Sequence, residues 1–171
     1  MSDVTQSRTR LHGLVLRICT GWAILGGLVL VAVALMNFAS IASFAVLNKS
    51  FNGDFELTEI GVAIAAFSFL PYCQIANLNV TADIFTARAS RFWLSIFSFV
   101  GAVIALCFGV ILLWRMYAGM IDMKTYDSTT ATLQIPLWWG FAGCLFSLAL
   151  LVVASFASLI EAFHTMSRRR A

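Results

Sequence analysis

The sequence predicts an all-α integral membrane protein with four transmembrane helices. Four stretches contain no Asp, Glu, Lys or Arg, and each exceeds the roughly 20 helical residues that cross a hydrocarbon core of about 30 Å. The composition agrees, because 61% of the 171 residues are hydrophobic, 11% are charged and the mean hydropathy is +0.91. Soluble domains lie far from these values. The uncharged stretches cover residues 18–48, 60–82, 92–114 and 128–160.

Aromatic residues refine the ends of these stretches, because Trp and Tyr favour the headgroup level of a bilayer. Trp93 and Trp114 bracket the third stretch, and Pro136, Trp138 and Trp139 stand at the start of the fourth. Proline suits a first helical turn, where its missing N–H costs nothing. We therefore predict spans near residues 15–37, 57–78, 92–117 and 135–161.

The chain has room for one membrane domain, residues 1–171, and for little else. The segments between the predicted spans are short, and no linker, low-complexity tract or internal repeat separates them. The first apolar stretch exceeds the roughly 7–15 residues of a signal-peptide core and no small-residue cleavage site follows soon after it, so we expect a retained span. A soluble catalytic domain or a nucleic-acid module is not expected.

Two stretches are too long for a straight crossing, since 18–48 and 128–160 would measure about 46 and 50 Å as helices. Residues 39–52 mix Phe and aliphatic residues with Ser and Asn, which suits a segment in the outer interface plane. A solvated loop is the alternative. Residues 80–91 have a similar character and predict a turn of interfacial helix between the second and third spans. The expected fold therefore includes short interfacial helical segments.

Orientation follows from the distribution of Lys and Arg in the segments that flank the spans. Eight such residues fall on the side of the termini and the middle loop, and three fall on the other side. We therefore expect both termini to be cytoplasmic. The basic residues of the first side are Arg8, Arg10, Arg17, Arg88, Arg91, Arg168, Arg169 and Arg170, against Lys49, Arg115 and Lys124.

Ionisable side chains near a span centre would indicate an ion path or a ligand site. None lies there on these boundaries, since Glu59, Arg115 and Glu161 fall at span ends, where they can reach water. Interface anchoring is one role for them, and contact with a partner subunit is the alternative. His12 and His164 lie at the cytoplasmic ends, which argues against haem held by paired histidines within the spans. We expect no catalytic residue, no cofactor and no metal.

Small residues predict where helices pack closely in lipid. Each span holds one cysteine without a paired spacing, so we expect Cys19, Cys73, Cys107 and Cys144 to act as small packing residues. Small residues also recur in spans three and four, on faces that could pack within the chain or against another subunit. These are Gly101, Ala105 and Gly109, and Gly140, Gly143 and Ser147.

Three motifs in this order resemble the small permease (Q) subunit of TRAP (tripartite ATP-independent periplasmic) transporters. They are GDFELTE at 53–59, NVTADIF at 79–85 followed by Arg88 and Arg91, and STTATLQIPLWW at 128–139. The resemblance covers about residues 35–160 and the four-span plan. The family more often has His at the position of Asn79 and an aliphatic residue at that of Ala82, so we expect no hydrogen bond specific to imidazole there.

The resemblance implies a non-catalytic subunit of the bacterial inner membrane that scaffolds a large permease (M) subunit. That complex would perform sodium-coupled uptake of an organic acid delivered by a periplasmic substrate-binding (P) protein. The expected partners are these two proteins and membrane lipids, with no nucleic acid. Residues that we expect to contact the partner or to set depth at the membrane interface are Glu59, Asp83, Arg88, Arg91, Trp138 and Trp139.

Two other classes fit a small four-span bundle. A membrane anchor of a respiratory dehydrogenase would bind haem or quinone, and a stand-alone small exporter would need a membrane-embedded carboxylate. The sequence carries neither paired histidines within the spans nor such a carboxylate. It is silent on the substrate, because in the family that specificity lies with the other subunits. The basic end at 168–170 predicts a chain that is not fused to the large subunit.

Overall fold

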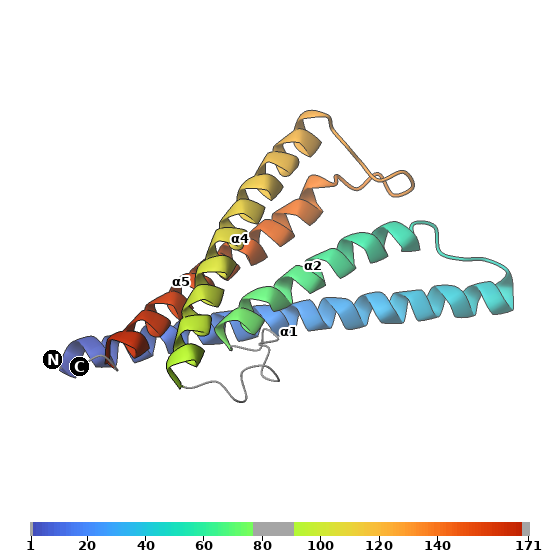
Figure 1. The fold of residues 1–171 in the computed structure, drawn as a ribbon. Coiled ribbons are helices and arrows are strands. Elements are labelled where there is room, and N and C mark those ends of the chain that lie inside the picture. The colour runs from blue at the N-terminus through green and yellow to red at the C-terminus, as the bar shows by residue number, and fades with distance from the viewer. Residues whose placement is uncertain (1, 77–90, 169–171) are drawn as a thin grey trace.

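The computed structural model describes residues 2–76 and 91–168, with the side chains of 13–76 and 99–160. Its four helices are α1 (Ser2–Leu47), α2 (Asp54–Ile75), α4 (Arg91–Thr125) and α5 (Trp138–Arg168), as Figure 1 shows. Each is long and apolar enough to cross a membrane. The described ranges contain no β-strand, only an isolated bridge between Thr129 and Pro136. The prediction of an all-α bundle with four spans is confirmed.

Helix α1 corrects the predicted end of the first span. We expected a span that ends near residue 37 and a separate interfacial segment at 39–52, but α1 continues without a break to Leu47. Residues 39–47 contain no Gly or Pro that would interrupt a helix. The helix ends at Asn48, whose φ of 52° is left-handed, a conformation that Asn tolerates after a helix C-terminus. Its 46 residues measure about 69 Å, so α1 exceeds the bilayer core.

The observed ends of the other helices differ from the predicted span boundaries by smaller amounts. Helix α4 runs two turns beyond the expected end at 117, to Thr125, and α5 begins at Trp138 rather than at 135. Pro136 therefore precedes α5, and its carbonyl accepts a hydrogen bond from the Trp139 N–H at 3.2 Å. The predicted interfacial turn at 80–91 lies outside the described residues, apart from Arg91 at the start of α4.

The helices pack in the order α1, α2, α5, α4, so α2 and α5 are central and α1 and α4 form the flanks. In Figure 1 the α1–α2 pair and the α4–α5 pair diverge toward the ends that carry their connecting loops. A smaller contact joins α1 to α5, where Trp22 Nε1 donates a hydrogen bond to Ser147 Oγ at 2.9 Å. The Trp22 ring also meets Phe146 edge-on, with centroids 4.5 Å apart.

Small side chains make the central packing close. The buried stripe of α5 repeats every three or four residues, as expected of one helix face. It consists of Cys144, Ser147, Leu148, Leu151, Ala154, Ser155 and Ser158. A Cβ placed on Gly143 would lie 3.1 Å from Ile64 on α2, and one on Gly140 would lie 3.3 Å from Ile60. These glycines let α2 and α5 approach at a distance that larger residues would prevent.

The other predicted packing residues divide between the interior and the surface. Gly109 is buried against Leu151 and Val152, whereas a Cβ on Gly101 would meet nothing within 4 Å. Cys19 and Cys144 are buried and Cys73 is half-buried, but Cys107 is exposed on α4. Within this chain, Cys19 and Cys144 therefore act as buried packing residues as predicted, and the packing role predicted for Cys107 has no partner among the described residues. Small residues in the sequence alone do not indicate which face of α4 packs against α5.

Candidate functional site

The six residues predicted to contact a partner or the interface do not form one cluster in the described structure. Glu59 is exposed in the second turn of α2, and Trp138 and Trp139 begin α5. Arg91 is the first residue of α4 and therefore lies at the opposite end of that helix from the loop that leads to Trp138. Asp83 and Arg88 lie outside the described residues. Their roles at an interface stay predictions.

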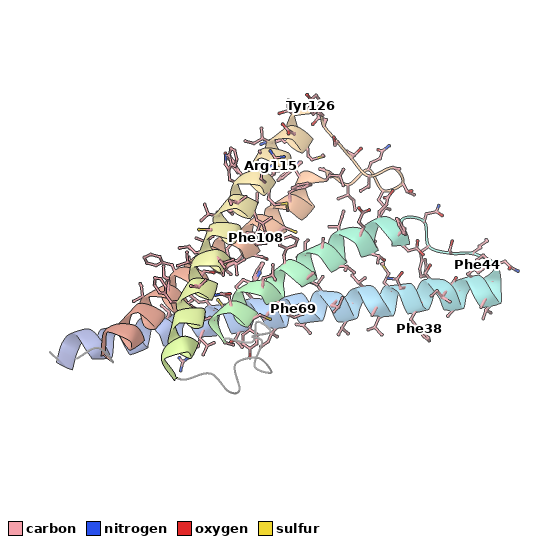
Figure 2. The ribbon with its side chains drawn as sticks, viewed as in Figure 1. Phe38, Phe44, Phe69, Phe108, Arg115 and Tyr126 are labelled. Carbon is pink, nitrogen blue, oxygen red and sulfur yellow. The ribbon has the colours of Figure 1, made fainter. Side chains whose placement is uncertain are left out.

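The two tryptophans differ in their surroundings. Trp138 is half-buried, and Lys124 Nζ lies 5.8 Å from its ring centroid, within the range of a cation–π contact. Trp139 is 60% exposed and meets Trp138 edge-on, with ring centroids 5.9 Å apart. Tyr126, which begins the connection between α4 and α5 and is labelled in Figure 2, is 78% exposed. An aromatic and cationic group of this kind suits the headgroup level of a membrane.

A second group, which we call the outer clasp, ties the two loops of this end together. Glu56 in the first turn of α2 accepts hydrogen bonds from the backbone N–H groups of Thr132 at 2.6 Å and Leu133 at 3.0 Å. Leu133 also lies over Gly53, the left-handed residue before α2. The clasp therefore fastens the α4–α5 loop to the start of α2.

The clasp continues to α1 through polar side chains. Ser40, which is 2% exposed, donates a hydrogen bond to the Asp54 carboxylate and accepts one from the Phe51 N–H at 3.3 Å. One helical turn deeper, Asn37 Nδ2 donates to Thr58 Oγ1 at 2.8 Å. These bonds fix the register between α1 and α2. The outer clasp consists of Ser40, Gly53, Asp54, Glu56, Thr132 and Leu133.

Five of the clasp residues, Gly53, Asp54, Glu56, Thr132 and Leu133, lie in the motifs that resemble the family, and no structural role was predicted for them. Ser40 was predicted to lie in an interfacial segment. One signal was present, since a glycine followed by two carboxylates in a first helical turn is typical of a stabilised helix start. The partners of those carboxylates come from segments 14 and 76 residues away, and local patterns carry no information about them.

We expect Glu56→Ala to release the α4–α5 loop without unfolding the bundle, because it removes both acceptors of the Thr132 and Leu133 N–H groups. Hydrogen exchange at these two amides should accelerate by roughly tenfold or more, while exchange in the middle of α2 stays unchanged. Glu59→Ala is the matched control, since Glu59 is an exposed carboxylate on the same helix. Equal exchange at the two amides in both variants would contradict the role of the clasp.

The bundle interior contains no charged side chain among the residues whose side chains are described. Its buried polar residues are Ser and Gln: Ser40, Ser68, Gln74, Ser147, Ser155 and Ser158. The described residues also include no group of three or more His, Cys, Asp or Glu side chains that could hold a metal ion. This part of the chain therefore offers neither an ion-binding carboxylate in its core nor a metal centre.

Comparison with known proteins identifies one family. A family model described as the DctQ component of tripartite ATP-independent periplasmic transporters matches residues 33–165, most of the chain. The match begins in the C-terminal part of α1 and ends in α5, so it includes the outer clasp and the whole of α2 and α4. No curated protein and no solved structure matched the sequence.

Proposed function

Since the chain belongs to the DctQ component family of tripartite ATP-independent periplasmic transporters, we propose that it is the scaffold for the transporter's large permease subunit. It is a multi-pass membrane protein and a transporter component. In this proposal the small chain holds the large subunit at a fixed depth in the inner membrane, with both of its own termini cytoplasmic. The large subunit then moves an organic acid with sodium, after delivery by a periplasmic binding protein.

The observation that carries this proposal is the uncharged interior of the bundle. Transport paths for ions or acids use ionisable groups that face the inside of a bundle or a water-filled cavity. The described interior has none, and its central helices are closely packed through Gly140 and Gly143. A closely packed, uncharged core suits a rigid support better than a moving transport element.

Purification of the tagged chain from its native membranes in mild detergent tests the proposal. We expect a large polytopic membrane protein in stoichiometric amount, identified by mass spectrometry, and an absorbance spectrum without a haem band. Reconstituted with the binding protein, this complex should take up an organic acid in response to a sodium gradient. A haem band together with a soluble dehydrogenase would overturn the proposal in favour of a respiratory membrane anchor.

The basic residues before α4 provide a mutational test of the scaffold. We expect Arg88→Glu combined with Arg91→Glu to lower the yield of the complex severalfold, because cytoplasmic positive charge sets the orientation of neighbouring spans. The charge-preserving pair Arg88→Lys and Arg91→Lys is the control and should retain assembly. Unchanged complex yield and uptake in the Glu variant would remove both residues from the proposed interface.

A further inference from the structure

The turn that precedes α2 contains the only Asn-Gly pair in the sequence, Asn52 and Gly53. The Asp54 N–H donates a hydrogen bond to the Phe51 carbonyl at 3.4 Å, which closes a four-residue turn. Gly53 has a φ of 84° and a ψ of 6°, and Asn52 does not have a positive φ, so the turn is of type II. The third residue of such a turn is usually glycine, because its φ is positive.

The pair brings together the two groups that take part in the deamidation of asparagine. The Asn52 side chain is exposed, and its amide makes no hydrogen bond within the part of the chain that the structure describes. The Gly53 N–H donates none to the described residues either. Since Gly53 has no Cβ, its nitrogen is the least hindered backbone nucleophile that can follow an asparagine. Both reacting groups are therefore present and unengaged.

The reaction of such a pair has two steps, and water is its only co-reactant. In the first step the Gly53 nitrogen attacks Cγ of Asn52. An N–Cγ bond forms, the Cγ–Nδ2 bond breaks, and Nδ2 leaves as ammonia with the proton that the Gly53 nitrogen loses. In the second step water opens the resulting succinimide ring. Attack of water at Cγ gives aspartate, whereas attack at the backbone carbonyl carbon gives isoaspartate, whose main chain passes through the former side chain.

The outer clasp holds the turn in a conformation that opposes the first step. Ring closure requires the Gly53 nitrogen to eclipse the Cβ of Asn52. A type II turn has a ψ of about 120° at its second residue, which directs that nitrogen away from Cβ. Leu133 covers Gly53, and Glu56 holds Leu133 through its backbone N–H at 3.0 Å. The turn can therefore rearrange for attack only when the clasp opens locally.

We propose that Asn52 and Gly53 form a self-modification site, at which the Gly53 nitrogen converts Asn52 through a succinimide mainly to isoaspartate, and that the outer clasp sets the rate. The inference goes beyond the proposed scaffold function and does not depend on it. It concerns a covalent change that the chain performs on itself with water alone.

The modification loosens the clasp that restrains it. Isoaspartate adds a methylene to the main chain of the turn, so the Asp54 N–H and the Phe51 carbonyl no longer have the spacing of a type II turn. The new carboxylate also stands two residues before Asp54 in the sequence, and like charges repel. Because ammonia has left the chain, the change is not reversed when the clasp closes again.

Incubation of the full chain, purified from its membranes in mild detergent, in a mildly alkaline buffer tests the modification. Peptide mass spectrometry follows the conversion of amide to carboxylate, and labelling by an isoaspartyl methyltransferase identifies isoaspartate. Asn48 is the matched internal control, because it is exposed in the same α1–α2 connection but is followed by Lys49, whose side chain hinders the attack. We expect Asn52 to react at least about tenfold faster than Asn48, mainly to isoaspartate. Equal rates, or aspartate without isoaspartate, would overturn the proposed site.

Glu56→Ala tests the control by the clasp. We expect this variant to modify Asn52 severalfold faster than the wild type, with an unchanged rate at Asn48, because the Leu133 N–H has lost its acceptor. Glu59→Ala, which removes an exposed carboxylate from the same helix, should leave the rate at Asn52 unchanged. The same rate at Asn52 in the wild type and in Glu56→Ala would show that the clasp does not set it.

Hydrogen exchange in an aged wild-type sample tests the loosening of the clasp. The Leu133 amide should exchange faster in molecules with isoaspartate at position 52 than in unmodified molecules of the same sample. Amides in the middle of α2 should exchange equally in both. Equal exchange at Leu133 would contradict the proposed effect of the modification on the clasp.

Discussion

Replacing Gly26 by alanine is expected to destabilise the bundle by about 1–3 kcal/mol, the usual cost of overpacking a closely packed interior. The added Cβ would lie 2.5 Å from the Ser68 Cβ and 3.3 Å from the Ala65 carbonyl oxygen. Neither atom can rotate away, because one is the first atom of its side chain and the other belongs to the backbone. Helices α1 and α2 must therefore move apart.

Gly21→Ala provides the matched control on the same helix. A Cβ at Gly21 would meet nothing within 4 Å, and alanine has a higher helix propensity than glycine. We therefore expect Gly21→Ala to be neutral or slightly stabilising. The free energy of unfolding, measured by circular dichroism in mixed detergent and SDS micelles, should be lower for Gly26→Ala than for Gly21→Ala. Equal effects of both substitutions would show that α1 and α2 do not pack at Gly26.

The second large effect is expected from Gly53→Ala at the start of α2. Gly53 has a φ of 84°, and an alanine in the left-handed conformation costs about 1–2 kcal/mol. The new Cβ would also overlap the Leu133 side chain, whose Cγ would be 2.4 Å away. The substitution therefore strains the backbone and weakens the outer clasp together. The free energy of unfolding should fall by the sum of these two effects.

A double variant separates these two causes. Leu133→Ala removes the overlapping atoms but leaves the backbone conformation of residue 53 unchanged. The double variant Gly53→Ala, Leu133→Ala should therefore lose less stability, relative to Leu133→Ala, than Gly53→Ala loses relative to wild type. An identical loss in both backgrounds would show that the contact with Leu133 contributes nothing.

The candidate site could be predicted only in part, for a reason that the outer clasp illustrates. Trp138 and Trp139 were placed near a membrane interface from aromatic preference alone, and they begin α5 next to Lys124. Glu56 could not be assigned a role in the same way, because its partners Thr132 and Leu133 become neighbours only when the α4–α5 loop folds back onto α2. A helix-start signal identifies a carboxylate but not the distant N–H groups that donate to it.

The sequence by itself determined the four spans and the family, because both are properties of order along the chain. Long uncharged stretches specify helices that cross a bilayer, and motifs such as 53–59 and 128–139 keep their spacing whatever the helices contact. The continuation of α1 to Leu47 could also have been predicted from the sequence, since residues 39–47 contain no helix-breaking Gly or Pro. The mixture of apolar residues with Ser and Asn at 39–52 favoured a separate segment at the membrane interface. For that reason the first span was predicted to end near residue 37.

Only the tertiary structure decided which face of each helix meets another helix. It showed that Gly26 and Gly109 each face a neighbouring helix, whereas Gly21 and Gly101 do not. In water, hydrophobicity would distinguish the buried face of a helix from its exposed face. In a lipid environment both faces are apolar, so the choice depends on close packing and register between segments that are distant in the chain.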